Sequence, residues 1–176
     1  MLRILLVAFC VAVAAPAEAK PAPERAQVEA AFTPGDDIAG LIERHIGLAR
    51  ESVRMQAYLF TDRRIALALL RALKRGVAVE VIGDAAQHES GGLPWLAPLE
   101  RAGARVYLNT VHAASHNKIV IVDGATVITG SYNFTQAAQS KNAENVVVIS
   151  GNRAIASRFV ENFEFHRLQS IPWPRP

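Results

Sequence analysis

The chain of 176 residues is long enough for one domain with a sizeable core, and it carries a formal net charge of +3 and an isoelectric point near 9.4. Its single cysteine excludes an internal disulfide, so packing or oligomerisation has to stabilise the fold. The small basic excess favours a polyanionic partner, but it does not distinguish nucleic acid from an anionic membrane.

Residues 1–19 are predicted to be an export leader that is removed from the mature protein. Arg3 supplies a short positive start, residues 4–15 form an apolar run, and Ala17-Glu18-Ala19 offers a cleavage site between small residues. A run of about twelve apolar residues is short against the ~20 that a membrane span needs, so a membrane anchor is the less favoured alternative. We therefore expect an exported bacterial protein, periplasmic or secreted, with no stable membrane association after cleavage.

Residues 20–176 are expected to form a single domain with extended, proline-rich ends. Strands are predicted at residues 28–32, 53–60, 77–82, 105–108, 118–122, 126–129 and 145–149. Helices are predicted at residues 38–49, 63–75, 95–102 and 152–168, with a glycine-containing loop at residues 83–94. Strands that are apolar on both faces need helices on both sides, which predicts an α/β fold of three layers: a mostly mixed central β-sheet flanked by helices on both faces.

Polar side chains appear where the strand predicted for residues 118–122 begins. His116 and Lys118 are two residues apart, so they project from the same face of an extended chain. Asp123 has the opposite parity and does not belong to the same cluster. Because Asp123-Gly124 is a common hairpin-turn sequence, a structural role is favoured for Asp123.

The length of that turn decides which side chains meet His116. A two-residue turn places Ser131 directly opposite His116 and Thr129 opposite Lys118, with Asn133 one step further on the same face. A longer turn shifts the register by one residue and sends Ser131 to the other side. We favour the two-residue turn, which makes four polar groups converge on one patch.

Imidazole, ammonium, hydroxyl and amide groups form the set needed to bind and attack a phosphate. The imidazole is a nucleophile, the ammonium neutralises the non-bridging oxygens, and the hydroxyl and amide donate hydrogen bonds. Buried polar groups without partners cost on the order of 1–3 kcal/mol each. Their presence at the end of an apolar sheet therefore indicates a functional site.

This pattern resembles the H-x-K-x4-D-x6-G-S-x-N motif of the phospholipase D superfamily. Every fixed position is matched, by His116, Lys118, Asp123, Gly130, Ser131 and Asn133. The chain looks most like the single-motif periplasmic endonucleases of that superfamily, and the resemblance covers most of residues 27–168. It implies structural roles for Asp123 and Gly130 and an orienting role for Glu144 beside the histidine. Lys141 is a candidate substrate contact.

The resemblance implies a two-step displacement through a phosphohistidine, which needs one neutral histidine to attack phosphorus and one protonated histidine to donate to the leaving oxygen. A single motif supplies only one of them. A homodimer is therefore implied, in which His116 and Lys118 of both copies meet at the two-fold axis. No metal or other cofactor is expected, because the chain has no H-E-x-x-H segment and the lysine supplies the charge of a divalent ion.

The favoured function is a metal-independent, non-specific endonuclease that cleaves DNA, with RNA as a second substrate. A phospholipase D-type hydrolase that acts on phospholipids by the same chemistry is the alternative. A catalytically silent nucleic-acid-binding module is a third hypothesis. The sequence leaves open the substrate preference, the strandedness, the biological role and the dimer contact surface.

Overall fold

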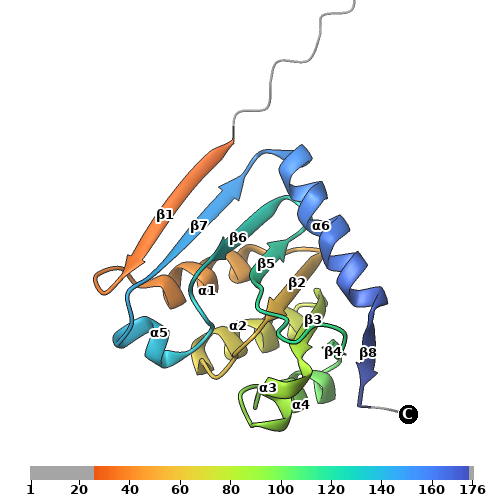
Figure 1. The fold of residues 1–176 in the computed structure, drawn as a ribbon. Helices are drawn as coiled ribbons and strands as arrows, with labels where there is room; N and C mark the ends of the chain where they lie inside the picture. The colour runs from red at the N-terminus through yellow and green to blue at the C-terminus, as the bar shows by residue number, and fades with distance from the viewer. Residues whose placement is uncertain (1–25, 175–176) are drawn as a thin grey trace, which may run out of the picture.

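The computed structural model describes residues 26–174, which form one mixed β-sheet with helices on both faces (Figure 1). The predicted leader and the proline-rich start of the mature chain lie outside the described residues. Within the described part, no helix is both long enough and apolar enough to cross a membrane.

The strands follow one another across the sheet in the order β1-β7-β6-β5-β2-β3-β4-β8. Their bounds are β1 Gln27–Thr33, β2 Ser52–Ala57, β3 Ala78–Asp84, β4 Arg105–Asn109, β5 Lys118–Val122, β6 Thr126–Gly130, β7 Glu144–Ser150 and β8 Ser170–Trp173. Strands β2, β3 and β4 are parallel to one another, and the other neighbouring pairs are antiparallel. The prediction of an α/β fold with a mixed central sheet is confirmed.

Except for α4, which follows Trp95, the helices of the described residues begin at polar residues that cap their free backbone N–H groups. Their bounds are α1 Ile38–Leu48, α2 Arg63–Lys74, α3 Ala85–Glu89, α4 Leu96–Arg101, α5 Gln136–Ser140 and α6 Arg153–Leu168. Asp37 caps α1, Asp62 caps α2 and Asn152 caps α6, each by accepting a hydrogen bond from a backbone N–H in the first turn. These caps explain why the three long helices start close to the predicted positions.

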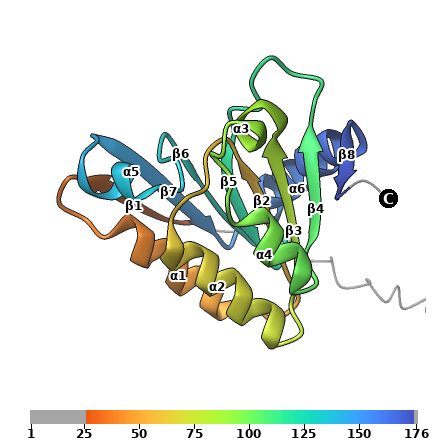
Figure 2. The same ribbon diagram turned by 90° about the horizontal axis from the view of Figure 1, so that it is seen from below.

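Two apolar layers hold the helices against the sheet. Helices α1 and α2 lie side by side across one face, where their buried positions pack on alternate residues of the strands, such as Val81 and Val120 (Figure 2). On the other face, Phe163 of α6 packs against Ile82, Ile119 and Ile121. The central strands are thus buried on both faces, as their continuous apolar runs predict.

The face that carries α6 is only partly covered. Helix α6 contacts β4, β5, β6 and β8, and within residues 26–174 no helix lies over β1 and β7 on that face (Figures 1 and 2). Val28 is 65% exposed and Phe32 is 57% exposed on β1. Their cross-strand partners on β7 are Ile149 and Asn145. We call this surface of β1 and β7 the open sheet face.

The predicted register of the β5–β6 hairpin is wrong by one residue. Val122 pairs with Thr126 and Ile119 pairs with Thr129, so three residues, and not two, form the turn. Asp123 and Gly124 both have positive φ angles, 52° and 61°. By continuation of this register Lys118 faces Gly130, which means that Ser131 is not the direct partner of His116.

Three short elements were missed in the sequence. The loop predicted at residues 83–94 contains α3, and α5 follows the second half of the motif. The proline-rich C-terminal end includes an edge strand, β8, in which Pro172 is paired antiparallel with Tyr107 of β4. A proline is tolerated there because one side of an edge strand needs no ladder hydrogen bond.

Candidate active site

The candidate site lies at the edge of the sheet where β2 ends and β5 begins. Ala57, the last residue of β2, pairs with Lys118, the first residue of β5. The predicted strand of residues 53–60 stops at Ala57, because the following residues leave the sheet, and Leu59 and Thr61 form backbone hydrogen bonds with Phe134 instead. The chain after β2 and the chain after β6 therefore run together beside the start of β5.

His116 and Lys118 are in direct contact, as their spacing predicts. The Lys118 Nζ atom lies 3.0 Å from Nδ1 of His116 and donates a hydrogen bond to the His116 carbonyl oxygen at 2.7 Å. His116 is exposed, whereas Lys118 is only 7% exposed. The imidazole can therefore reach a substrate in solution, while the buried ammonium stays in contact with its Nδ1 atom.

Burial changes the acidity of the lysine. It lowers the pKa of the Lys118 ammonium to about 8, and the nearby carboxylate of Glu144 acts in the opposite direction. Lys118 is thus still mostly protonated at neutral pH. A poorly solvated cation of this kind interacts strongly with an anionic phosphate.

Tyr58 contacts both of these side chains and was not singled out in the sequence. Its ring centroid lies 4.4 Å from that of His116 at an interplanar angle of 56°, and Lys118 Nζ lies 5.0 Å from the same Tyr58 centroid. Tyr58 directly follows β2, but only the pairing of β2 with β5 brings it to His116. No local signal in the sequence predicts that pairing.

Ser131 and Glu144 form a second polar pair at this edge. The Ser131 hydroxyl donates to Glu144 at 2.6 Å and accepts from the backbone N–H of Asn145, and Asn142 donates to the other Glu144 oxygen at 2.9 Å. Both carboxylate oxygens are thus occupied within the chain. Among the described residues, no hydrogen bond joins Glu144 to His116 of the same chain.

The remaining predicted site residues occupy different environments. Gly130 is required by close packing, since a Cβ atom there would overlap the carbonyl oxygen of Asn145. Asn133 has a buried Oδ1 atom without a hydrogen-bond partner in the described chain. Lys141 is exposed just after α5, and none of its contacts links it to His116.

Asp123 lies at the end of β5 far from His116. Its carboxylate accepts hydrogen bonds from the backbone N–H groups of Arg50, Glu51 and Ser52 at 2.8 to 3.2 Å. These bonds hold the pKa of the Asp123 carboxyl below its usual value, although burial acts in the opposite direction. The side chain thus anchors the hairpin turn to the start of β2.

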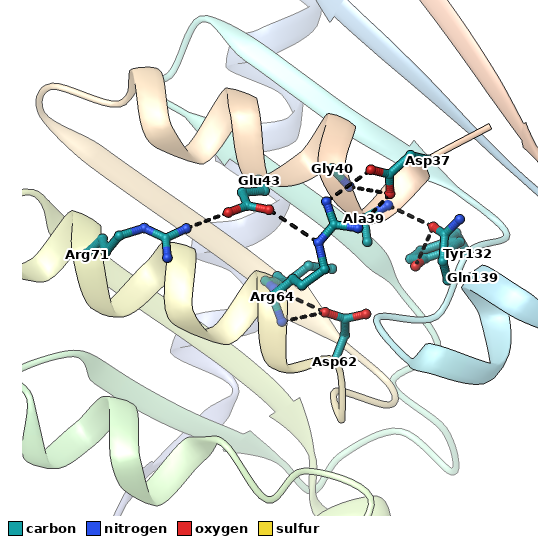
Figure 3. A network of polar contacts seen from close by, with 10 residues as sticks. Asp37, Ala39, Gly40, Glu43, Asp62, Arg64, Arg71, Tyr132 and Gln139 are labelled. Carbon is teal, nitrogen blue, oxygen red and sulfur yellow. Dashed lines mark hydrogen bonds and ion pairs between the residues drawn. The ribbon is translucent and has the colours of Figure 1, made fainter.

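A network of polar contacts fixes the loop that carries Ser131 and Asn133 (Figure 3). Tyr132 is buried in that loop, and its hydroxyl donates to Gln139 Oε1 at 3.3 Å. The Gln139 side chain also accepts from the backbone of Ala39 and donates to that of Asp36, at the start of α1. Burial raises the pKa of Tyr132, so the hydroxyl stays protonated and able to donate.

On its other side, the same network joins α1 to α2. Arg64 of α2 binds Asp37, the cap of α1, with two hydrogen bonds of 2.8 and 3.0 Å, and also contacts Glu43, which accepts from Arg71 at 2.7 Å (Figure 3). The Arg64 guanidinium lowers the pKa of Asp37. The loop of Ser131 and Asn133 is therefore braced by two helices that are themselves fixed to each other.

Known proteins share this fold and sequence pattern. The family model described as "Cardiolipin synthase, PLD-like domain" matches residues 42–167. The chain belongs to the phospholipase D superfamily. Like the members of that superfamily, it is a phosphodiesterase hydrolase. Within residues 26–174, no three or more of the side chains that could bind a metal ion (His, Cys, Asp or Glu) lie together.

Several relatives of this superfamily are similar over most of the chain. A phospholipase D of Rickettsia felis is 39% identical over 139 residues, which cover 79% of this chain and 68% of the relative. A mitochondrial cardiolipin hydrolase of Xenopus tropicalis is 34% identical over 116 residues, 66% of this chain and 54% of the relative. The Rickettsia proteins are thus matched over more of their length than the hydrolase.

Solved structures show the same arrangement of strands and helices. Nuc of Salmonella typhimurium, a phospholipase D family member, has a TM-score of 0.80 at 32% identity, covering 86% of this chain and 100% of Nuc. NucT of Helicobacter pylori has a TM-score of 0.77 at 20% identity and is also covered completely, which shows a common fold. The described domain thus corresponds to the whole of Nuc, a member of the same superfamily.

Proposed function

We propose that the chain is a metal-independent endonuclease that cleaves DNA, and also RNA, through a phosphohistidine at a homodimeric active site. The observation that carries the proposal is the exposed His116 imidazole in contact with the buried Lys118 ammonium, 3.0 Å from Nζ to Nδ1. A nucleophile and a fixed cation side by side are what phosphoryl transfer requires when no metal takes part.

The reaction takes two displacements. In the first, a neutral His116 nitrogen attacks phosphorus, the bond from phosphorus to the leaving oxygen breaks, and a protonated second histidine gives that oxygen its proton. In the second, the now neutral second histidine takes a proton from water as the water oxygen attacks phosphorus, and the phosphorus–nitrogen bond breaks. Lys118 and Asn133 hold the phosphoryl oxygens, and Ser131 assists by holding Glu144, to which its hydroxyl donates.

The second histidine comes from a second copy of the chain in this proposal. The other histidines of the described chain are not in contact with His116, so one protomer offers one imidazole to a phosphate. Glu144 would then orient the His116 ring of the partner subunit, because each of its partly exposed carboxylate oxygens keeps a lone pair besides the bond from Ser131 or Asn142. A two-fold axis beside His116 would supply the second histidine and would also bring Glu144 of each copy to the imidazole of the other.

The open sheet face supports a dimer on this side of the molecule. It presents Val28, Phe32, Val147 and Ile149 on a surface that carries no helix within the described residues. The face ends at Asn145, at the sheet edge where β7 and β5 begin. The side chains of Glu144 and Lys118 project to the other face, so a second copy on the open sheet face has to extend around this edge to reach the candidate site. Burying such apolar side chains contributes roughly 25 cal/mol per Å2.

A dimer-breaking variant tests this contact surface. Phe32→Lys places a charge on the open sheet face, and we expect a monomer in analytical ultracentrifugation together with loss of activity. Leu48→Lys is the matched control, because Leu48 is 70% exposed at the end of α1 on the opposite side of the sheet. A dimeric, fully active Phe32→Lys protein would refute the assignment of the surface.

The relatives support two substrate classes equally. The small structures Nuc and NucT, whose full length this domain covers, support the nuclease assignment. The Rickettsia relatives named phospholipase D support phospholipid hydrolysis by the same chemistry. The second candidate function is therefore a phospholipase D-type hydrolase.

The deciding experiment is a substrate panel in EDTA. Plasmid DNA, single-stranded DNA, RNA and phosphatidylcholine or cardiolipin vesicles are compared with the His116→Ala variant as the inactive control and His45→Ala, in α1, as the matched control. We expect nucleic acid cleavage in EDTA and at least ~10²–10⁴-fold loss in His116→Ala only. Faster release of a lipid headgroup would select the second candidate, and strict dependence on Mg²⁺ would overturn the mechanism.

Export is part of the proposal. Residues 1–19 would direct the chain out of the cytoplasm and then be removed, leaving a periplasmic or secreted enzyme. Cell fractionation followed by N-terminal sequencing of the mature protein tests this, with a start near Lys20 as the expected result. A full-length protein in the cytoplasmic fraction contradicts it.

A further inference from the structure

Asp84 is a buried carboxylate that the proposed chemistry does not use. It is the last residue of β3 and is only 2% exposed. Its Oδ1 accepts from the backbone N–H of Gln87 at 2.8 Å and caps α3, and its Oδ2 accepts from the backbone N–H of Ser115 at 2.7 Å. Both oxygens are therefore engaged by the protein, and Asp84 is not available to a substrate.

The two partners of Asp84 lead to His116 by different routes. Ser115 is buried and directly precedes His116, so the bond from its N–H to Asp84 fixes the backbone from which the imidazole projects. Gln87 donates from Nε2 to the hydroxyl oxygen of Tyr58 at 3.0 Å. The ring of Tyr58 in turn lies against the imidazole, with centroids 4.4 Å apart.

Backbone hydrogen bonds hold the connection through Gln87 and Tyr58 in place. The carbonyl of Gln87 accepts from the N–H of Gly92 at 2.7 Å, and the carbonyl of Gly92 accepts from the N–H of Phe60 at 2.9 Å. Gly92 packs so closely on Leu59 that a Cβ atom would lie 2.6 Å from the end of the Leu59 side chain, and it would also be in tight contact with Gln87. The loop containing α3 is thus fixed to the segment that carries Tyr58.

We propose that Asp84 and Tyr58, linked by Gln87, are positioning residues that hold the backbone and the ring of His116 in the attacking orientation. The inference rests on the proposed role of His116. An exposed imidazole attached to a loop would otherwise sample several rotamers, and only a fraction of them would place its nitrogen in line with phosphorus. Restricting those rotamers raises kcat without adding any contact to the substrate.

Separate variants test the two routes. Asp84→Ser keeps an N-cap for α3 but is too short to reach Ser115 as well. Tyr58→Leu removes the aromatic contact, and Tyr58→Phe removes only the hydroxyl that accepts from Gln87. Asn152→Ala, which destabilises the chain by uncapping α6, is the control for lost stability, and Tyr107→Phe, in β4, is the control for a lost hydroxyl.

Kinetics and the state of the imidazole are both measured. For Asp84→Ser and Tyr58→Leu we expect kcat to fall by about 10–100-fold with KM changed by less than about threefold, and Tyr58→Phe to lose less than about fivefold. The 15N NMR signals of the His116 ring should show a changed tautomer ratio in Tyr58→Leu. Both controls should match the wild type in kcat and in these signals.

Wild-type kcat and unaltered His116 signals in Asp84→Ser and Tyr58→Leu would overturn the proposal. Thermal unfolding of each variant separates lost positioning from lost folding, because Asn152→Ala should be destabilised by a similar amount without losing kcat. The NMR signals need no substrate. They therefore decide the positioning role even if the proposed phosphodiester cleavage itself fails, which the EDTA panel detects independently.

Discussion

Lys118 is expected to lose its charge within the pH range in which activity is measured. Burial lowers its pKa from 10.5 to about 8. At pH 9 about a tenth of such side chains remain protonated, against about 97% for an unperturbed lysine. Between pH 7 and pH 9 this effect alone should lower activity about tenfold if one charged lysine is needed, and about a hundredfold if a dimeric site needs both.

The lysine effect can be separated from every other cause of pH dependence. Lys118→Arg keeps a cation that stays protonated over the whole pH range of the assay, so its activity should lack the decrease caused by the lysine. Its activity should also start from a lower value, because the guanidinium differs in shape. The assay is the initial rate on a chromogenic phosphodiester such as bis(4-nitrophenyl) phosphate from pH 6 to 10. The ratio of wild-type to Lys118→Arg activity should be constant below pH 7 and fall about tenfold or a hundredfold by pH 9.

A ratio that stays constant up to pH 9.5 would refute the reasoning. If Lys118→Arg proves too slow to assay, 13C NMR of the lysine side chains reports the titration directly. A midpoint above pH 10 for Lys118 would then show that burial at the edge of β5 does not weaken the ammonium. The size of the decrease in the activity ratio also indicates whether each site needs one charged lysine or two, which tests the dimer.

Three further outcomes are expected. Mixing His116→Ala with Lys118→Ala chains should not restore full activity in a complementation assay, because each mixed dimer still lacks one histidine. Recovery to half or more of the wild-type rate would contradict a two-histidine site. Gly130→Ala should lower the free energy of unfolding by about 1–3 kcal/mol in urea titrations, since its Cβ atom meets the Asn145 carbonyl. Asp123→Ala should be less stable than the wild type near neutral pH, and the difference in the free energy of unfolding should shrink in unfolding curves measured below pH 3.8. The reason is that a carboxyl whose pKa is lowered in the folded state stops stabilising the fold as the pH falls through that pKa. A difference that stays constant with pH would exclude this linkage.

The pairing of His116 with Lys118 follows from the sequence because it depends only on local geometry. Two residues separated by one position in an extended chain share a face whatever the rest of the fold does. The same holds for the helices of α1, α2 and α6, whose apolar spacing and capping residues act within a few residues. The fold class follows from these elements, since doubly apolar strands need helices on both sides.

The tertiary structure decided the contacts between distant segments. The three-residue turn that moves Ser131 away from His116 depends on how Asp123 binds the backbone of residues 50–52, which lie more than seventy positions away. Tyr58 reaches His116 only because β2 pairs with β5, and Asp84 reaches Ser115 only because the loop after β4 returns to the end of β3. Local periodicity carries no information on which strands pair, because that choice is set by the packing of the whole domain.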